Sequence, residues 1–469
     1  MSVMKRSKQL LESKVPKMVV TRDTRQKTLE KRASKHNCHA AEMYGDLKKG
    51  EFWLLVICAY SCMLGQGFID NTRSVTYPLM KTDLHLSYTE FGGLQSMAQF
   101  SYLFWSLAVA MSLQKLGFKL VIVLSFLMSI SGCILTAFSS NYVTVFMYQF
   151  LACAGMGALD DCPHALSSIL FKKNTGLLML LLHSCYGLGA VFGPIFAAFV
   201  KSKLPKYSFR GISFLMSVPL SILCLFILFV PFAIKKPQKE EMVKEKKGHT
   251  VWSALVSPMV WLQALILVLM TTGERATSAW GGLYLEDVLH LDPAKEGAWF
   301  NSCFYVAFTT ARLVGGLLVD WLGPFCMEYI VLALSMVIFA VGLSIGKAGV
   351  YVLPFAGCTV AFFWPTFIVI CMRYWKEDAA VPISCILPMQ ASLGIPIQLF
   401  LGWLNDRYGH GTAYWSTVPT IGIALVLLII FHFILLRKEK GENSEAEKGL
   451  LESSATVDVD GAAPSGEKL

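Results

Sequence analysis

Acidic side chains set deep in uncharged sequence are the residues most able to do chemistry in this chain. Asp70 directly follows the uncharged run Phe52–Ile69, and Asp160 and Asp161 stand next to each other inside another apolar run. A carboxylate at membrane depth costs about 2.5–3.5 kcal/mol to insert, and it usually marks the path of an ion or a substrate. Two carboxylates from different helices that line one cavity would suit proton coupling, because burial and mutual repulsion favour the protonated form.

Each of these acids also has a purely structural interpretation. Asp70 could pair with Arg73, three positions later, and the two charges would then neutralise each other. Asp160 has His164 four positions later on the same helix face, so these two could also pair. Alternatively, the adjacent acid pair could cap a helix break before Pro163. The sequence leaves these alternatives open.

A second group of candidates lies in the other half of the chain. Glu274 and Arg275 follow a long uncharged run and precede the segment Ala-Thr-Ser-Ala-Trp-Gly-Gly. We expect an interrupted helix there, since breaks at membrane depth occur where they line a cavity. Glu274 would then accept a hydrogen bond from a solute hydroxyl, and an anchor at the outer interface is the alternative. Arg312 is expected to pair with Glu274 or Asp320 rather than to snorkel to the surface.

Aromatic, amide and imidazole side chains complete the expected solute contacts. Trp280 and Trp364 lie beside polar or proline positions and could stack on a sugar ring, whereas most of the eleven tryptophans should lie at the membrane interface. His183 is expected to hydrogen-bond to a neighbouring helix rather than to titrate. The expected solute contacts are Asn71, Arg73, His164, His183, Glu274, Arg275, Trp280, Arg312, Trp364 and Gln390.

The composition excludes several classes of protein. The 469 residues are 55% hydrophobic and 16% charged, whereas soluble domains carry about 25% charged residues, so we expect an integral membrane protein. The net charge of +9 reflects Lys and Arg in tails and short loops and does not indicate nucleic-acid binding. No P-loop, nucleophile elbow or HExxH motif is present, so neither an enzyme nor a cofactor is expected. No metal site is expected either, since the cluster His36-Asn-Cys-His39 lies in a polar tail.

Twelve apolar runs divide into two halves. A helix needs roughly 20 apolar residues to cross a bilayer. We predict an all-α integral membrane fold with twelve transmembrane helices in two pseudo-symmetric six-helix bundles. The predicted parts are a disordered basic tail (1–51), an N-terminal six-helix bundle (52–234), a basic linker (235–250), a C-terminal six-helix bundle (251–436) and a disordered tail (437–469).

The distribution of Lys and Arg predicts the orientation. Six basic segments fall on one face, among them the N-terminal tail, the linker and the start of the C-terminal tail. Cytoplasmic loops carry the excess of positive charge, so both termini are expected in the cytoplasm. The segment from Lys201 to Arg210, with four basic residues, falls on the opposite face, but the six segments carry more basic residues and decide the predicted orientation.

Matching positions indicate that the two halves repeat each other. Asp70 matches Glu274, His183 matches Gln390, and the end of the second span matches the end of the eighth, all at a nearly constant offset of about 205 residues. Repeats of this kind place solute and ion sites between the halves, near the middle of the membrane.

The ends of two spans resemble the loop signature of the major facilitator superfamily. The signature is kept in part at Gly316, Leu318, Asp320 and Gly323. A fuller copy, 402–410, ends the eleventh span on the predicted outer face, where the usual cytoplasmic gating role is not expected. The resemblance covers roughly residues 50 to 437 and implies a transporter fold.

The fifth span also resembles that superfamily, in which a pattern of small residues followed by proline marks a close-packed helix. Small residues four apart let helices approach each other, and proline removes a helix hydrogen bond. The expected gating and packing residues are Gly189, Gly193, Pro194, Gly316 and Asp320.

A narrower resemblance is to the fucose permease-like, sugar:proton symporter branch. The resemblance implies alternating access, with protons bound by one acid of the first span and one of the fourth, here Asp70 and Asp160. The residues that carry it are Asp70, Pro78, Gly155, Gly157, His183, Tyr186, Gly187, Gly189, Gly273, Glu274, Trp280, Thr310, Arg312, Gly316, Trp364, Pro365 and Thr366.

We therefore expect a secondary active transporter of a small polar solute, first of all a sugar, coupled to protons or another cation. One alternative is an organic-anion or peptide exchanger that uses Arg73, Arg275 and Arg312. Another is a transporter-derived receptor that senses a solute without moving it. The plasma membrane or an organelle membrane is the expected location, and the leucine pairs Leu10-Leu11 and Leu450-Leu451 make sorting proteins candidate partners of the tails.

Overall fold

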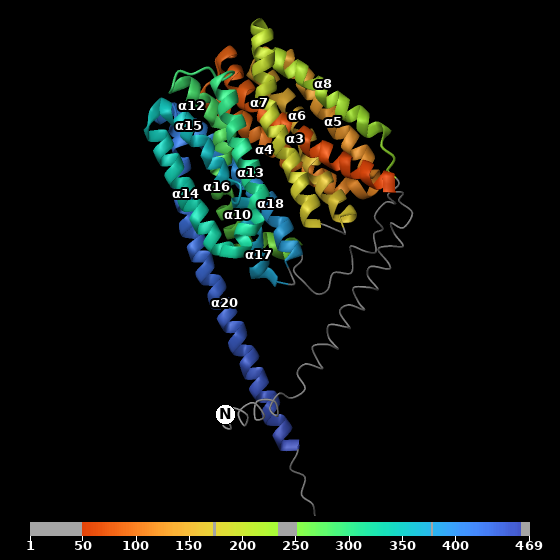
Figure 1. Ribbon diagram of the computed structural model, residues 1–469, viewed down its shortest axis with the longest axis vertical. Helices are drawn as coiled ribbons and strands as arrows, with labels where there is room; N and C mark the ends of the chain where they lie inside the picture. The colour runs from red at the N-terminus through yellow and green to blue at the C-terminus, as the bar shows by residue number, and fades with distance from the viewer. Residues whose placement is uncertain (1–48, 172–174, 233–250, 377–378, 461–469) are drawn as a thin grey trace, which may run out of the picture. The chain divides into compact units, whose positions relative to one another are not determined.

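Helices make up the described part of the molecule (Figure 1). The computed structural model describes residues 49–171, 175–232, 251–376 and 379–460, and these ranges contain no strand. The larger of two structural units comprises Val56–Val230 and Lys236–Leu469, and the smaller comprises Met1–Leu55 and Pro231–Lys235. The predicted basic tail and linker lie almost entirely outside the described residues. The described parts of both predicted bundles lie in the larger unit, apart from residues 52–55 and 231–232 of the N-terminal bundle.

Six long helices form the N-terminal half, one at each predicted span. The side chain of Ser87 accepts a hydrogen bond from the Glu90 amide and so starts the second helix in a capping box, and Asn141 starts the fourth in the same way. The elements are α3 (Lys49–Asp83), α4 (Tyr88–Leu116), α5 (Phe118–Ala137), α6 (Tyr142–Leu170), α7 (Thr175–Lys203), the short turn η1 (Pro205–Tyr207) and α8 (Ser208–Phe229).

Six further spans form the C-terminal half, and the seventh and tenth are broken. The expected interruption near Glu274 is present as a π-helical turn, η2. The elements are α9 (Val251–Val256), α10 (Pro258–Met270), α11 (Thr272–Arg275), η2 (Ala276–Trp280), α12 (Gly281–Asp287), α13 (Glu296–Leu322), α14 (Pro324–Ser344), η3 (Gly346–Ala348), α15 (Gly349–Val352), η4 (Leu353–Phe355), α16 (Ala356–Val360), α17 (Phe363–Trp375), α18 (Ala380–Tyr408), α19 (Thr412–Trp415) and α20 (Thr417–Asp460).

The number of spans agrees with the prediction. Nine helical segments of the described residues are long and apolar enough to cross a membrane. Three further segments lie at predicted spans but are interrupted or more polar, namely α4, α13 and the run from α9 to α12. The fold is thus an all-α membrane fold of twelve transmembrane helices in two six-helix halves.

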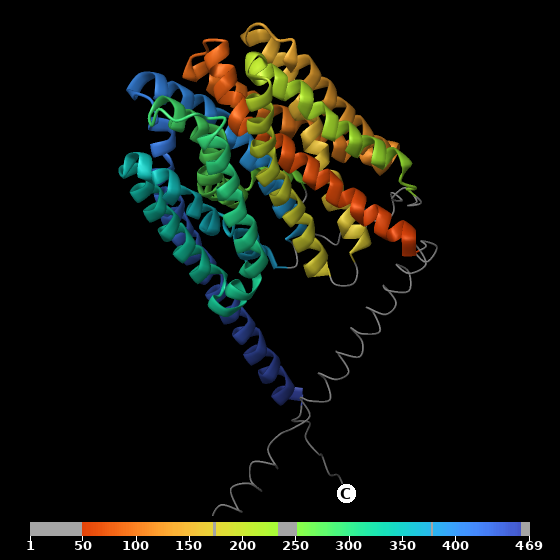
Figure 2. The same ribbon diagram turned by 45° about the horizontal axis from the view of Figure 1, so that its top comes forward.

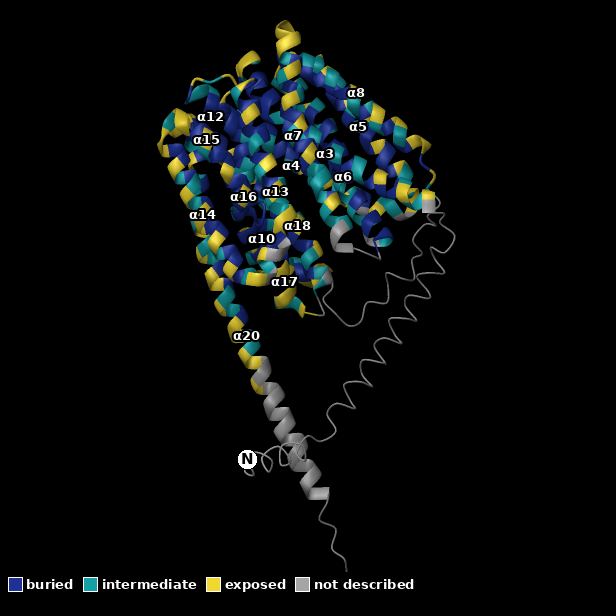
Figure 3. Cartoon of the chain, in the orientation of Figure 1, coloured by how far each residue is buried: buried dark blue, intermediate teal, exposed yellow. Residues whose placement is uncertain are grey.

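Exposed residues run along several helices (Figure 3), and many of them are apolar. On α8, Phe214 is 46% exposed, Val218 50% and Ile222 61%, and on α14 Leu334 and Val337 are exposed as well. Extended exposed apolar surface of this kind marks contact with a membrane or a partner. Because both helices are membrane spans, we assign these faces to the lipid.

Glycines bring α7 into backbone contact with α3. A Cβ atom on Gly189 would lie 2.2 Å from the carbonyl oxygen of Leu64 on α3. One on Gly193 would lie 2.6 Å from the carbonyl oxygen of Phe68, one turn further along α3. Gly67 of α3 fits α7 equally tightly, since its Cβ would lie 2.1 Å from a carbonyl oxygen there. Pro194 lies within the same helix. Small residues permit this close approach where larger ones would not.

The same helix also contacts α13 of the other half. A Cβ on Gly187 would lie 2.0 Å from the hydroxyl oxygen of Thr309. One helical turn along, the hydroxyl of Ser302 donates to the carbonyl of Val191 at 2.9 Å. Two neighbours from different halves therefore fix the position of α7.

The last helix is longer than its composition suggests. The polar sequence predicts a disordered tail from Arg437, whereas α20 runs to Asp460, and Figures 1 and 2 show it continuing past the neighbouring helices. Its Glu and Lys residues are good helix formers, which favours this extension. Arg373 of α17 donates to both carboxylate oxygens of Glu439, at 2.8 and 3.0 Å, and so ties the two helices together.

Replacing Gly189 with alanine is expected to lower the stability of the protein, because the added Cβ would clash with the α3 backbone. Overpacking of this kind costs about 1–3 kcal/mol. Gly422→Ala is the matched control, since its Cβ would meet only the sulfur of Met336, at 3.4 Å. Thermal unfolding of the two purified variants in detergent measures the difference, and equal unfolding midpoints would contradict the packing described here.

Candidate functional site

Asp70 lies within α3 and contacts two helices. Nη1 of Arg73 lies 3.4 Å from its Oδ1, and the hydroxyl of Tyr186 on α7 donates to its Oδ2 at 3.0 Å. The side chain of Asp70 is 43% exposed, whereas that of Arg73 is 12% exposed. The carboxylate is therefore a group that a proton or a solute can reach, while the guanidinium is largely enclosed.

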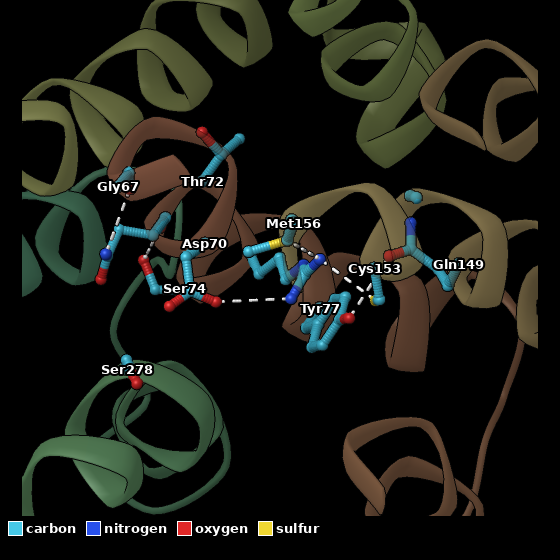
Figure 4. Close-up of polar contacts among 12 residues, drawn as sticks. Gly67, Asp70, Thr72, Ser74, Tyr77, Gln149, Cys153, Met156 and Ser278 are labelled. Carbon is cyan, nitrogen blue, oxygen red and sulfur yellow. Dashed lines mark hydrogen bonds and ion pairs between the residues drawn. The ribbon is translucent and has the colours of Figure 1, made fainter. Parts of the chain in front are cut away.

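Two sulfur atoms of α6 contact the far side of the Arg73 guanidinium. Its Nη2 donates to Sδ of Met156 at 2.7 Å and to Sγ of Cys153 at 3.1 Å, and the group lies 5.8 Å from the ring centre of Tyr77. In Figure 4, dashed lines run from Asp70, Met156 and Cys153 to the nitrogen atoms of the guanidinium that lies between them. Sulfur is a weak acceptor, so Asp70 is the strongest partner of Arg73 among the described residues. The sequence does not reveal the two sulfurs, because Cys and Met are ordinary apolar fillers of a helix interface.

Four side chains connect an acid of one half to an acid of the other. Tyr305 on α13 donates to Oε1 of Glu274 at 3.3 Å, just as Tyr186 donates to Asp70. The two tyrosine rings meet edge to face, with centroids 6.4 Å apart. We call Asp70, Tyr186, Tyr305 and Glu274 the acid–tyrosine chain. Sequence alone does not single out Tyr305, because nothing near it distinguishes it from other helix tyrosines.

A second polar group lies around Asp160 on α6. The hydroxyl of Tyr102 donates to its carboxylate. Nδ1 of His164 donates to the Asp160 carbonyl at 2.7 Å and lies 3.6 Å from its carboxylate. The ring of His183 on α7 lies 5.1 Å from that of His164 and 6.4 Å from that of Trp364 on α17. Rings from three helices and both halves are thus brought together beside this acid.

Asp161, the other acid of the adjacent pair, is partly buried on α6. Both acids lie inside one continuous helix that also contains Pro163 and runs to Leu170. They therefore do not cap a helix break, which corrects the structural alternative drawn from the sequence.

Three predicted solute contacts lie in the packing between helices. Trp280 is 1% exposed, and its indole nitrogen donates to Gln398 at 2.9 Å. Gln390 is 7% exposed and donates to Thr271 at 3.1 Å. Asn71 is fully buried; its own amide bonds the α3 backbone, and it accepts a hydrogen bond from Asn301 across the halves at 3.3 Å. Their polar atoms already have partners inside the protein.

The arginines of the C-terminal half have partners other than those predicted. The guanidinium of Arg312 lies 4.1 Å from the ring centre of Phe308, and its Nε donates to the carbonyl of Ala361 at 3.3 Å. No described carboxylate lies within 4.0 Å of Arg312 or Arg275. The expected ion pair between Arg312 and Glu274 is therefore not formed at that distance. An aromatic ring and a backbone carbonyl take its place.

Some predicted residues fall outside what the structure describes. Gly316 and Asp320 belong to α13, but the burial of Gly316 and the side chain of Asp320 are not described. His36 and His39 also lie outside the described ranges. Within those ranges, no group of three or more His, Cys, Asp or Glu side chains could hold a metal ion.

A family model matches well over half of the sequence. The model of the Major Facilitator Superfamily matches residues 55–384. The chain belongs to this superfamily. Members of the superfamily that resemble the chain are transporters rather than enzymes, so the protein is a multi-pass membrane transporter.

Two curated relatives differ in what their names say they carry. A putative glucose/galactose transporter of Helicobacter pylori is 24% identical over 318 residues, which cover 64% of this chain and 76% of the relative. Citrate exporter 1 of Yarrowia lipolytica is 26% identical over 245 residues, which cover 51% of this chain and 33% of that protein. Both identities are low, so neither relative decides the solute.

Solved transporter structures share the fold. The nucleoside transporter NupG superposes with a TM-score of 0.66 at 14% identity, covering 81% of this chain and 99% of that one. A D-xylose-proton symporter superposes with a TM-score of 0.65 at 13% identity, covering 80% and 97%. At these identities the likeness concerns the twelve-helix superfamily fold alone.

A double-mutant cycle tests how firmly Arg73 holds Asp70. We expect Asp70→Asn and Arg73→Gln to show a coupling energy below about 1 kcal/mol, because the carboxylate is 43% exposed. Unfolding of the wild type, both single variants and the double variant supplies the four stabilities. The bidentate pair of Arg373 and Glu439 serves as a comparison. A coupling of several kcal/mol at Asp70 would mean that its charge is locked in place.

Proposed function

We propose that this transporter moves a small polar solute by alternating access and couples the movement to protons, with a sugar as the first candidate for the solute. The acid–tyrosine chain is the observation that carries the proposal. Its acids are matched with each other by the repeat predicted from the sequence, and its tyrosines meet where helices of the two halves touch. Rocking of one half against the other would separate the rings of Tyr186 and Tyr305. The hydrogen-bond partners of each acid would then differ between the outward-open and inward-open states.

Asp70 is the proposed main proton site. In its ionised form the carboxylate has Arg73 and Tyr186 as partners. A proton on the carboxylate removes the attraction to Arg73, and a solute hydroxyl then replaces the hydroxyl of Tyr186 as its hydrogen-bond partner. Asp160 is the proposed second site, with Asp161 as its neighbour and His164 as the group that shares its proton.

A neutral solute with several hydroxyl groups suits this arrangement. Carboxylates at both ends of the acid–tyrosine chain accept hydrogen bonds, and tyrosine hydroxyls between them donate and accept. The rings of His183 and Trp364 offer flat faces on which a sugar ring would stack. The glucose/galactose transporter named above supports the same solute class.

An organic anion is the second candidate for the solute. The guanidinium groups of Arg275 and Arg312 have no carboxylate within 4.0 Å among the described side chains. An anionic solute would find a ready partner in either, because guanidinium binds carboxylates in bidentate fashion. The similarity to a citrate exporter points the same way. A receptor that binds solute without moving it is the remaining alternative.

The proposed setting is the plasma membrane or an organelle membrane, with both termini in the cytoplasm. The basic loops predicted on that side support the orientation. Proteins that recognise sorting signals are proposed partners of the two tails.

Asp70→Asn is expected to abolish uptake against a gradient while exchange of bound for external solute continues, because exchange needs binding but no proton movement. Proteoliposomes carrying a pH gradient measure both, together with the alkalinisation of the medium during uptake. Asp83→Asn is the control, since Asp83 pairs with Arg210 inside one half at 3.7 Å. Undiminished uptake by Asp70→Asn would exclude Asp70 as the proton site. Binding without any flux would favour the receptor.

A thermal-shift screen is expected to identify the solute class. A ligand at a hundred times its Kd stabilises the folded state by about 2.7 kcal/mol. Neutral sugars should raise the unfolding midpoint of the purified protein more than organic acids, nucleosides or peptides do, and Trp364→Ala should reduce that shift. A larger shift with citrate or benzoate, lost in Arg312→Gln, would favour the anion candidate instead.

A further inference from the structure

Hydrogen bonds between the two halves close one end of the helices. This outer end is where α3, α12 and α18 finish, at Asp83, Asp287 and Tyr408, and where α4 begins, at Tyr88. The charge distribution of the loops places it away from the cytoplasm. Asp406, in the last turn of α18, makes three hydrogen bonds to the other half there.

Asp406 binds the start of α4. Its Oδ1 accepts from the amide of Tyr88 at 3.0 Å, and its Oδ2 accepts from the amide and the hydroxyl of Thr89 at 2.7 and 2.5 Å. The capping box of α4 satisfies two amides: that of Glu90 donates to the Ser87 hydroxyl oxygen, and that of Ser87 donates to the Glu90 carboxylate. Asp406 thus takes the two amides that the box leaves free, and its charge faces the positive end of the helix dipole.

Glycines allow the two helices to come this close. A Cβ on Gly402 would lie 2.3 Å from the carbonyl oxygen of Tyr88, and one on Gly92 would lie 2.5 Å from that of Gln398. The two helices therefore meet backbone to backbone at the outer end. Asp406 follows Gly402 by about one helical turn, which brings its carboxylate to the end of α4.

Further contacts at the outer end run in the same direction: the N-terminal half supplies the donors, and the C-terminal half supplies the carboxylates. Thr82 donates to Glu286 at 3.0 Å, the hydroxyl of Tyr88 donates to Asp287, and Nζ of Lys81 lies 3.5 Å from Asp287.

Farther along, α4 changes its partner. The hydroxyl of Ser96 still bonds α18, donating to the carbonyl of Ile395 at 2.6 Å. Ser101 and Tyr102 instead bond α6 of their own half. The bonds between α4 and α18 thus belong to the outer part of α4, and its inner part is tied within one half.

We propose that Asp406 is a positioning residue of the transport cycle, a latch that holds the outer end closed while the inner end is open. The inference rests on the alternating access proposed above. Opening the outer end moves α18 away from α4 and leaves the amides of Tyr88 and Thr89 to water. The carboxylate therefore stabilises one of the two states selectively, which is the condition for shifting the balance between them.

Hydrogen–deuterium exchange of the full-length protein in lipid nanodiscs reports on the latch without any solute. In Asp406→Asn the shape is kept and the charge is lost, so the amides of Tyr88 and Thr89 are expected to exchange at least about tenfold faster. Faster exchange is also expected at the outer ends of α3 and α12. The control is Glu296→Gln, an acid at the same end that accepts from the Asp292 amide of its own half, and it should leave α4 unchanged.

Exchange at the start of α4 that is no faster in Asp406→Asn than in the control would overturn the latch. So would faster exchange confined to α18, since that would report local loss of structure. Thr89→Ala, which removes one of the three donors, is the second variant in case Asp406→Asn does not fold, and a smaller increase at Tyr88 is expected from it. Faster exchange in a protein that moves none of the tested solutes would support the latch and count against the proposed function.

Discussion

Close packing of α7 between α3 and α13 is the constraint on which the central arrangement depends. Glycines at 67, 189 and 193 allow α7 to lie against the α3 backbone, and Gly187 allows α7 to lie against Thr309 of α13. Tyr186 immediately precedes Gly187, so its hydroxyl is delivered to Asp70 and its ring to Tyr305. A bulkier residue at any of these glycines would separate the helices and pull apart the acid–tyrosine chain.

Lipid offers no partner to a charge, so a charged group inside the helices is stable only where it has a partner within the protein or faces water. The structure uses unequal partners for this purpose. Arg73 is enclosed by sulfur atoms and one half-exposed carboxylate, and Arg312 lies on an aromatic ring beside a backbone carbonyl. These partners are weak compared with a bidentate carboxylate. Arg373, by contrast, has a bidentate partner in Glu439.

The sequence predicts the helices better than their contacts. Uncharged runs and their basic ends place the spans, and the acidic residues inside them predict where polar groups meet, because the cost of a buried charge is a local property. Trp280 shows the limit: its polar neighbours suggest a ring that stacks on a solute, but the indole is buried and donates to Gln398. Tyr88 and Asp406 are 318 positions apart, so their contact follows from how two helices cross, which no local pattern encodes. The extension of α20 is a further case in which composition underestimated helix propensity.

That extension connects the last helix of the protein to its centre. Glu439 holds Arg373 through two hydrogen bonds, so α20 cannot slide along its axis without breaking them or taking α17 with it. The same α17 carries Trp364, whose ring faces His183 of the opposite half. The tie to the last helix and the aromatic ring at the boundary between the halves therefore belong to one helix, about two and a half turns apart.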